Sequence, residues 1–264
     1  MTDVLLGLIN VIWHLCIGVP VCKISFMCTL RSFRLQTTST IARMLNKLLT
    51  RMCDNTFFKF ADDTYFVIPT TKASTCTRAS EIDNIVAWAA DSNLSLNKSK
   101  STEVLFHDNS RGKLKTLPPP LSDITQETSL KILGVTFRNN LSASDHIRNV
   151  VSESAKTLYA LRVLRYHGLS DAGLQEVFHA VVISRLTYAS TAWSKFVTAT
   201  DIQRVDAFLR RSKRCGFCPP GLPDFGDQLA EFDDRLFSRI SRNPQHVLYR
   251  LLPPPSVASQ NYDL

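Results

Sequence analysis

The sequence lacks the regular spacing of cysteines and histidines that structural zinc sites and disulfide frameworks require. Its seven cysteines are an odd number scattered along the chain, which is typical of a reduced, intracellular protein of the nucleus or the cytoplasm. Cys215 and Cys218 form one CxxC pair, but no second CxxC or HxxxH lies nearby to complete four zinc ligands. We therefore expect no structural zinc site.

The N-terminal apolar run lacks the preceding basic residues of a secretory signal peptide. Residues 4–22 carry no formal charge and have the length of a membrane-spanning helix, roughly 20 residues. Asn10, His14 and a Gly-Val-Pro sequence at 18–20 interrupt the run. These interruptions favour a buried helix or strand followed by a turn, with a membrane anchor as the alternative.

Acidic residues are too few to balance the basic ones. The chain has 23 Asp and Glu against 31 Lys and Arg, a net charge of +8, and its pI is about 9.2. This balance favours an anionic partner, either nucleic acid or an acidic membrane surface. With 44% hydrophobic and 20% charged residues, the composition suits a globular protein of one or two domains.

Two adjacent carboxylates, Asp62 and Asp63, interrupt the sequence FFKFADDTYFVI at residues 57–68. The flanking segments, 57–60 and 65–68, are rich in aromatic and β-branched residues, so the pair is predicted at the tip of a β-hairpin. A plain turn is one interpretation, since aspartate is a common turn former. The other is a metal site, because Mg²⁺ prefers carboxylate oxygens held rigidly.

The predicted elements are mainly strands up to residue 140 and long helices after it. Before residue 140 the patterns predict helices at 41–52 and 80–92, strands at 103–106 and 132–137 with Gly134 inside the latter, and a proline loop at 118–120. After it, they predict helices from 144, at 171–196 and at 201–214, and shorter ones within 224–252. The apolar helix at 171–196 is expected to be the most buried.

Four segments, in a consistent order, carry a family resemblance. Residues 59–64, KFADDT, match the motif [YF]-A-D-D, and WAADSNLSLNKSKSTEVLF at 88–106 contains N-x-x-K-[ST]. LKILGVTF at 130–137 matches y-L-G-v-x-[LF], and basic helices with the tail RRSKRCGFCPPGLP follow. Together they resemble the reverse transcriptases of non-LTR retrotransposons of the jockey type, over about three quarters of the chain.

The resemblance implies an α+β fold, in which a partial palm, an antiparallel hairpin plus a helix, is followed by an α-helical thumb. The implied divisions are a divergent N-terminal segment at 1–56, a partial palm with the FADD hairpin and a primer-grip-like strand at 57–140, a helical thumb at 141–216, and a C-terminal extension and tail at 217–264. The family is an RNA-directed DNA polymerase, a nucleotidyltransferase that uses Mg²⁺, an RNA template, a DNA primer and dNTPs. No specific protein partner and no membrane association follow from it.

The resemblance also implies roles for individual residues. In two-metal nucleotidyl transfer one ion activates the attacking hydroxyl and the other holds the triphosphate. Asp62 would be the principal Mg²⁺ ligand, with Asp63 as its neighbour. Lys100 matches a palm lysine that neutralises or protonates the leaving pyrophosphate, or else it is a solvated charge at a strand edge. Gly134 would let the primer backbone approach closely, or it marks a β-bulge.

Parts of the family's active site are absent from the sequence. Before Asp62 the acidic residues are Asp3 and Asp54, and neither fits the third carboxylate of an F-x-D strand. A G-x-P-Q-G-S turn is represented by its first half at 18–20, and a fingers domain does not fit into about 56 residues. We expect a truncated or altered polymerase joined to unrelated sequence before about residue 55. It should bind Mg²⁺ weakly and not polymerise alone, because misaligned reactants lose many orders of magnitude in rate.

A partial palm has a consequence for stability. Its sheet is expected to expose an unpaired edge and an apolar face, which are aggregation liabilities. The apolar run at 4–22 is a candidate cover for part of that face. The helical region after residue 140 is expected to be the better-folded half.

The helical region is rich in basic residues. Residues 142–216 contain eleven Lys and Arg against six Asp and Glu, including Arg210, Arg211, Lys213 and Arg214. Such a surface would bind phosphates in a salt-dependent way, although a solvated helix face or a nuclear-localisation patch are alternatives. Three hypotheses remain: an enzyme completed by another chain, a non-catalytic nucleic-acid-binding remnant, and a relic without a selected function.

Overall fold

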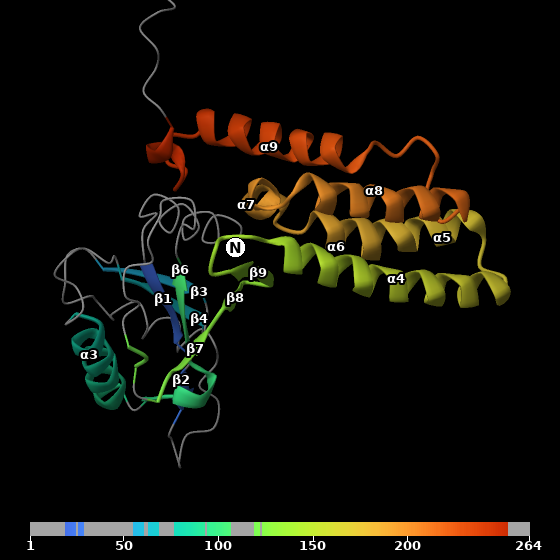
Figure 1. Cartoon of the computed structure of the whole chain (residues 1–264). Coiled ribbons are helices and arrows are strands. Elements are labelled where there is room, and N and C mark those ends of the chain that lie inside the picture. The colour runs from blue at the N-terminus through green and yellow to red at the C-terminus, as the bar shows by residue number, and fades with distance from the viewer. Residues whose placement is uncertain are drawn as a thin grey trace, which may run out of the picture.

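The protein has an α+β fold, as predicted, in which a small sheet is followed by a group of helices. The computed structural model describes residues 19–24, 26–28, 55–60, 63–68, 77–92, 94–106, 119–121 and 123–252. Figure 1 shows the helices α4 to α8 extending away from the sheet as an arm. The helix predicted at 41–52 lies outside the described residues.

The main sheet has five strands in the order β3-β4-β1-β6-β7. Their bounds are Val19–Ile24 for β1, Thr56–Phe60 for β3, Asp63–Val67 for β4, Thr102–Phe106 for β6 and Thr125–Glu127 for β7. Strands β6 and β7 pair in parallel and the other neighbours are antiparallel. A separate pair joins β2, Phe26–Cys28, to β5, Leu94–Leu96.

Strand β1 begins within the apolar run at 4–22, which was expected to be a buried helix or strand followed by a turn. Its Val21 pairs with Val67 of β4 on one side and with Val104 of β6 on the other, so β1 lies inside the sheet. Residues 19–22, the end of the apolar run, are therefore strand and not the end of a membrane helix or a cover over the sheet. Residues 4–18 lie outside the described part of the chain.

The predicted hairpin around the aspartate pair is confirmed. Strands β3 and β4 pair along their whole length, from Thr56 with Val67 to Phe60 with Asp63. The residues that join them, 61 and 62, are not among those described. The hairpin is one edge of the sheet, and β1 supplies the neighbour that β4 was expected to lack.

Helix α3, Thr77–Asp91, covers one face of the sheet and begins three residues before the predicted helix (Figure 1). Its Ile85 is buried in a small core with Phe66 and Ile68. The next residue, Val86, belongs to the predicted apolar helix but is 41% exposed. The apolar stripe of α3 is therefore narrower than the sequence suggested.

Buried polar side chains fasten α3 to the strands. Nε of Arg78 lies 3.0 Å from Oε1 of Glu103 on β6, and both side chains are buried. Gln126 of β7 donates a 3.2 Å hydrogen bond to the other oxygen of Glu103. At the other end of the sheet order, Asn55 donates a 3.0 Å hydrogen bond to the buried Glu81. Each buried carboxylate therefore has a polar partner, as burial of a charge requires.

The strand predicted at 132–137 is in fact a tight hairpin. Strand β8, Ser129–Ile132, pairs with β9, Val135–Arg138, and Leu133 and Gly134 form the turn between them. Their φ angles are +46° and +94°, as in a type I′ turn. Gly134 therefore lies in a turn and not inside a strand, because the left-handed backbone there favours glycine.

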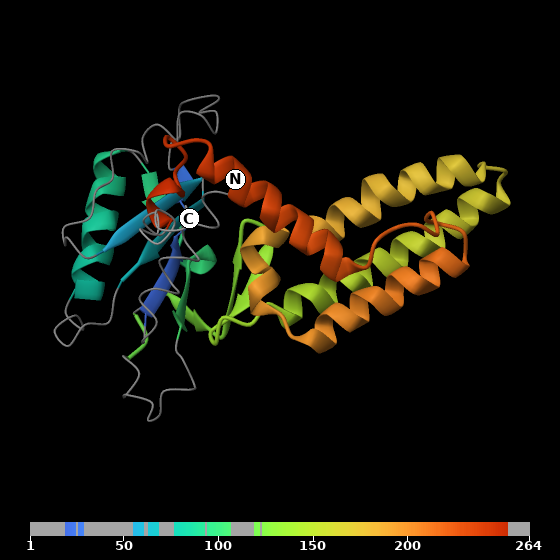
Figure 2. The same cartoon turned by 90° about the horizontal axis from the view of Figure 1, so that it is seen from above.

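The helical arm is built from runs that lie side by side (Figure 1, Figure 2). The helices are α4, Ser144–Tyr166; α5, Asp171–Val177; a π-helix, Phe178–Ile183; α6, Ser184–Thr187; α7, Ser190–Trp193; and α8, Ala199–Arg214. A 3-10 turn follows α7 at Ser194–Phe196, and another lies at Tyr249–Leu251. Helix α9, Phe225–Ser241, returns above the others toward the sheet.

The helix predicted at 171–196 is broken near its C-terminal end. Ala189 has a φ of +51°, and the chain changes direction there between α6 and α7. Much of this run is buried nonetheless, including Phe178, Val182 and Trp193. In the part of the chain that is described, no helix is both long and apolar enough to cross a membrane.

One hydrophobic core joins the sheet to the helices. Tyr65 and Val67 of β4 belong to the same buried cluster as Phe137 of β9, Leu158 of α4 and Trp193 of α7. The sheet face opposite α3 is therefore covered by the β8–β9 hairpin and the base of the arm. This corrects the expectation that the sheet would expose an apolar face.

Candidate functional site

The aspartate-bearing end of β4 lies against the end of β1. Asp63 is the first residue of β4, and Asp62 lies outside the described residues. On the inner side of β4, Thr64 pairs with Ile24, the last residue of β1. Any partner carboxylate from the adjoining strand would therefore have to come from this end of β1.

Strand β1 carries no carboxylate in its sequence, Val-Pro-Val-Cys-Lys-Ile. Its one charged residue is Lys23, which pairs in register with Tyr65 of β4 and with Thr102 of β6. Asp123, ahead of β7 at this end, is separated from β4 by β1 and β6 and is ion-paired with Lys98. Two Mg²⁺ ions need carboxylate oxygens from more than one direction, so the described residues do not fit this metal pair.

Lys100 lies at the same end of the sheet as Asp63. It ends a 3-10 turn, Lys98–Lys100, directly before β6, whose first residue Thr102 is level with Lys23 and Tyr65 in the strand register. Lys100 is exposed. The topology therefore brings Lys100 and Asp63 to one edge, with β1 between their strands.

The motif N-x-x-K-S has a structural explanation that the sequence analysis missed. The side-chain oxygen of Asn97 accepts a 3.2 Å hydrogen bond from the backbone N–H of Lys100. The hydroxyl of the buried Ser101 donates a 2.8 Å bond to the carbonyl of Asn97. Asn97 and Ser101 thus hold the turn that presents Lys100, as short polar side chains commonly do in turns.

Gly134 is in close contact with a side chain of the helical arm. A Cβ atom at this position would lie 3.3 Å from Cε1 of Tyr188, at the bend between α6 and α7. Burial raises the pKa of the Tyr188 hydroxyl above its ordinary value. The close approach that was expected for a primer backbone is thus already made by this tyrosine, at least on one side of the glycine.

The predicted basic cluster at the end of α8 divides into two kinds of residue. Lys213 is half-buried and donates a 2.6 Å hydrogen bond to the carbonyl of Leu222, so it fastens the following loop. Arg210, Arg211 and Arg214 are exposed, and the guanidinium of Arg211 lies 5.9 Å from the ring centre of Phe208. Three of the four predicted residues are therefore presented to solvent.

Many of the other basic residues of the arm are already ion-paired. The pairs are Arg148 with Asp145, Lys156 with Glu153, Arg165 with Asp171, Lys195 with Asp233 and Arg204 with Asp201. The other six of the eleven make no ion pair among the described residues: Arg162, Arg185, Arg210, Arg211, Lys213 and Arg214. The surface available for phosphate is thus smaller than the count of eleven basic residues suggested.

Helix α4 presents an aromatic strip that the sequence analysis did not single out. Tyr159 is 71% exposed and Tyr166 is 88% exposed, with the exposed Arg162 between them. The spacing of three, four and seven residues puts all three on one face of the helix. The sequence pattern that could have revealed this strip is Y-x-x-R-x-x-x-Y. It places two tyrosines on the same helix face as an arginine, whereas large aromatic residues of a helix are usually buried.

The CxxC pair closes the far end of the arm. Cys218 is buried in the core, and burial raises the pKa of its thiol, although the charge of Lys213 acts in the opposite direction. The carbonyl of Cys215 accepts a 2.9 Å hydrogen bond from Arg165 of α4, whose guanidinium lies 4.4 Å from the ring centre of Phe217. The described residues contain no group of three or more side chains that could hold a metal ion.

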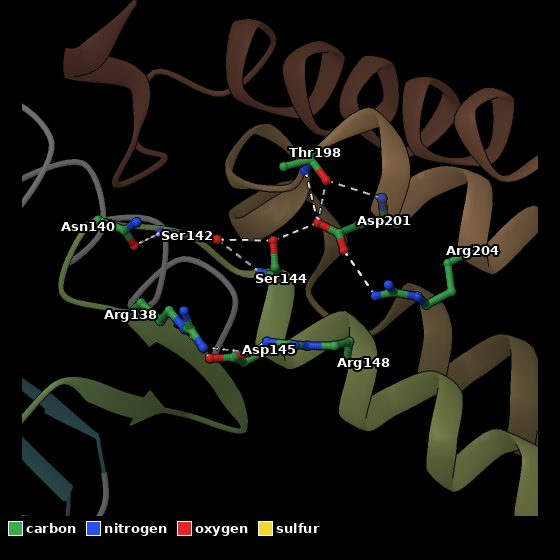
Figure 3. A network of polar contacts seen from close by, with 9 residues as sticks. All are labelled: Arg138, Asn140, Ser142, Ser144, Asp145, Arg148, Thr198, Asp201 and Arg204. Carbon is green, nitrogen blue, oxygen red and sulfur yellow. Dashed lines mark hydrogen bonds and ion pairs between the residues drawn. The ribbon is translucent and has the colours of Figure 1, made fainter. Parts of the chain in front are cut away.

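A polar network joins the base of α4 to the base of α8 (Figure 3). Thr198 caps α8: its hydroxyl accepts from the N–H of Asp201, and its own N–H donates to the Asp201 carboxylate. Burial alone would raise the pKa of Asp201, but hydrogen bonds from Ser144 and Thr198 and the charge of Arg204 lower it overall. The network fixes the base of the arm and offers no reactive group.

The described residues thus present a sheet end with Asp63 and Lys100 and an arm with exposed arginines and tyrosines. Cationic side chains suit phosphate groups, and exposed aromatic rings suit nucleic-acid bases. No protein-family model matches the chain, and no curated protein matches it either.

Proposed function

We propose that this chain is a palm and thumb derived from a non-LTR retrotransposon reverse transcriptase, and that it binds nucleic acid without polymerising alone. The observation that carries the proposal is the end of the sheet at Asp63. There the FADD hairpin lies beside β1, and Lys100 leads into β6 on the other side of β1. An acidic pair at a hairpin, with a lysine at the same edge of the sheet, supports the proposal of a palm, and the helical arm would then be the thumb.

The absence of catalysis follows from the composition of β1. The strand next to β4 offers Lys23 and Ile24 at the end where a further carboxylate would be needed. Neither a lysine nor an isoleucine supplies the carboxylate oxygens that Mg²⁺ prefers. Without carboxylates on both sides, two metal ions are not held, and the primer terminus and the triphosphate are not aligned.

Primer extension tests the catalytic part of the proposal. The full chain is mixed with a primed RNA template, Mg²⁺ and dNTPs, with an active reverse transcriptase as positive control. We expect no extension above background. Robust product that disappears in Asp62→Ala, but persists in the matched control Asp91→Ala on α3, would overturn the proposed inactivity.

Salt-dependent binding tests the nucleic-acid part. Fluorescence anisotropy with labelled RNA, single-stranded and duplex, should show affinity falling as salt rises, with a log–log slope of about −0.7 to −0.9 for each phosphate contact. Replacing Arg210, Arg211 and Arg214 together by alanine should reduce that slope by roughly two units. The control is Arg235→Ala on α9, an arginine already paired with Glu231. No binding at low salt would favour a relic without selected function.

A further inference from the structure

Leu133, in the β8–β9 turn, is held between two tyrosines from distant parts of the chain. Its backbone N–H donates a 3.2 Å hydrogen bond to the hydroxyl of Tyr65. Its carbonyl accepts a 2.9 Å hydrogen bond from the hydroxyl of Tyr188. Both polar groups of one backbone residue are thus satisfied by side chains, one from strand β4 and one from the α6–α7 bend.

The connection continues into the core on each side. Tyr65 is fully buried and follows Asp63 by two residues on β4. The carbonyl of Tyr188 accepts a 2.9 Å hydrogen bond from the indole N–H of Trp193, which is also fully buried. An unbroken series of contacts therefore runs from Tyr65 through Leu133 and Tyr188 to Trp193, from the sheet to the arm.

The β8–β9 turn is rigid, so Leu133 cannot lose its hydrogen bond to one tyrosine without moving relative to the other. Leu133 and Gly134 both have positive φ, which confines a two-residue turn to one narrow geometry. The Tyr188 ring lies against Gly134, within 3.3 Å of where a Cβ would be. A shift that moves Leu133 away from Tyr65 would therefore also disturb its contact with Tyr188.

We propose that Leu133 fastens the sheet to the helical arm, and that its two hydrogen bonds open together in a single local event. This inference concerns the fold and does not depend on the proposed binding of nucleic acid. It predicts that removing the hydroxyl of one tyrosine speeds hydrogen exchange at the N–H group that is bonded to the other tyrosine.

Hydrogen exchange followed by NMR on the full chain tests the proposal. In Tyr188→Phe, the amide of Leu133 should exchange about tenfold faster, the equivalent of one hydrogen bond, although its own acceptor Tyr65 is intact. In Tyr65→Phe, the indole N–H of Trp193 should exchange faster by a similar factor. The chain has three tryptophans, so the Trp193 indole signal can be assigned by substitution.

Matched controls distinguish a coupled opening at Leu133 from a general loss of stability. Tyr166→Phe removes a hydroxyl from an exposed tyrosine and should change neither signal. The amides of Val104 on β6 and Leu209 on α8, both deep in the core, should keep their rates in all three variants. An unchanged Leu133 amide in Tyr188→Phe would overturn the proposal, and so would equal acceleration at Val104 and Leu209.

Discussion

The hydroxyl of Ser144 donates a 2.6 Å hydrogen bond to Oδ2 of Asp201, and this bond joins the first turn of α4 to the first turn of α8. The same oxygen accepts a 2.8 Å bond from the hydroxyl of Thr198. Asp201 is almost completely buried. One carboxylate therefore satisfies polar groups at the starts of two helices, which fixes where both leave the sheet (Figure 3).

Asp201→Ala should destabilise the fold by about 2–3 kcal/mol, because it removes the buried charged acceptor shared by the hydroxyls of Ser144 and Thr198 and breaks the cap of α8. Urea denaturation followed by circular dichroism measures the change. Asp234→Ala, at an exposed position on α9, is the matched control and should stay within about 0.5 kcal/mol. An effect no larger than that of the control would show that the network contributes little.

His146 should make stability depend on pH. Burial, with a smaller contribution from the charge of Lys131, lowers the pKa of the imidazole from 6.5 to about 4. Between these values the unfolded chain takes up a proton that the folded chain resists, so stability is full above pH 6.5. It is lost as the pH falls toward 4, by about 3 kcal/mol in total.

The contribution of His146 is isolated by comparison with a variant. Denaturation midpoints are measured from pH 4 to 7 for the native chain, for His146→Gln and for His167→Gln, in which an exposed histidine is changed. The slope over this range should flatten in the first variant and persist in the second. Parallel curves for all three proteins would contradict a buried neutral imidazole at this position.

Gly134→Ala should cost about 1–3 kcal/mol, because alanine is strained at a φ of +94°. The added methyl group would also press on the ring of Tyr188. The control is Gly221→Ala, where an added Cβ meets nothing within 4 Å. Thermal unfolding of both variants gives the comparison, and equal melting temperatures would exclude a special role for the turn.

Glu103→Ala should destabilise the protein by about 3–5 kcal/mol, since it leaves the buried Arg78 without its carboxylate. The double variant Arg78→Met, Glu103→Leu should recover much of that loss, because apolar residues carry no desolvation cost. Urea titrations of the single and double variants measure the difference. An exposed ion pair serves as the control for this buried one. Glu231→Gln breaks the pair with Arg235 and should reduce stability by roughly 0–1 kcal/mol.

Local patterns predicted the elements whose stability is local. The hairpin β3–β4 followed from aromatic and β-branched residues on both sides of two turn-forming aspartates. Helix α8 was predicted at 201–214, with Cys215 and Gly216 after its end, and the structure adds only two residues at its start. In these segments the signals of composition, period and capping agree.

The missed features depend on contacts between distant residues. No glycine or proline marks the break at Ala189, where the bend is held by hydrogen bonds from Tyr188 to Leu133 and from Trp193 to Tyr188. Leu133 gives no turn signal, since leucine rarely adopts a positive φ. Strand β1 was hidden inside an uncharged apolar run, and its partners on β4 and β6 are far away in the sequence.

From the sequence, neither acidic residue before Asp62 was expected to fit a third-carboxylate strand beside the hairpin. The structure has a strand there, with Lys23 and Ile24 at the relevant end. Predictions for Asp62, Asp63 and Lys100 as a catalytic group remain predictions, because their roles are not decided by the position of the backbone.

The central position of β1 dictates the sequence of events by which this protein can fold. Strands β4 and β6 do not pair with each other, and each pairs instead with a different edge of β1. During synthesis β1 precedes both partners, and its second edge remains unpaired until Thr102–Phe106 has left the ribosome. Such non-local closure slows folding, so a nascent chain carries an exposed strand for longer than a chain of sequential hairpins would.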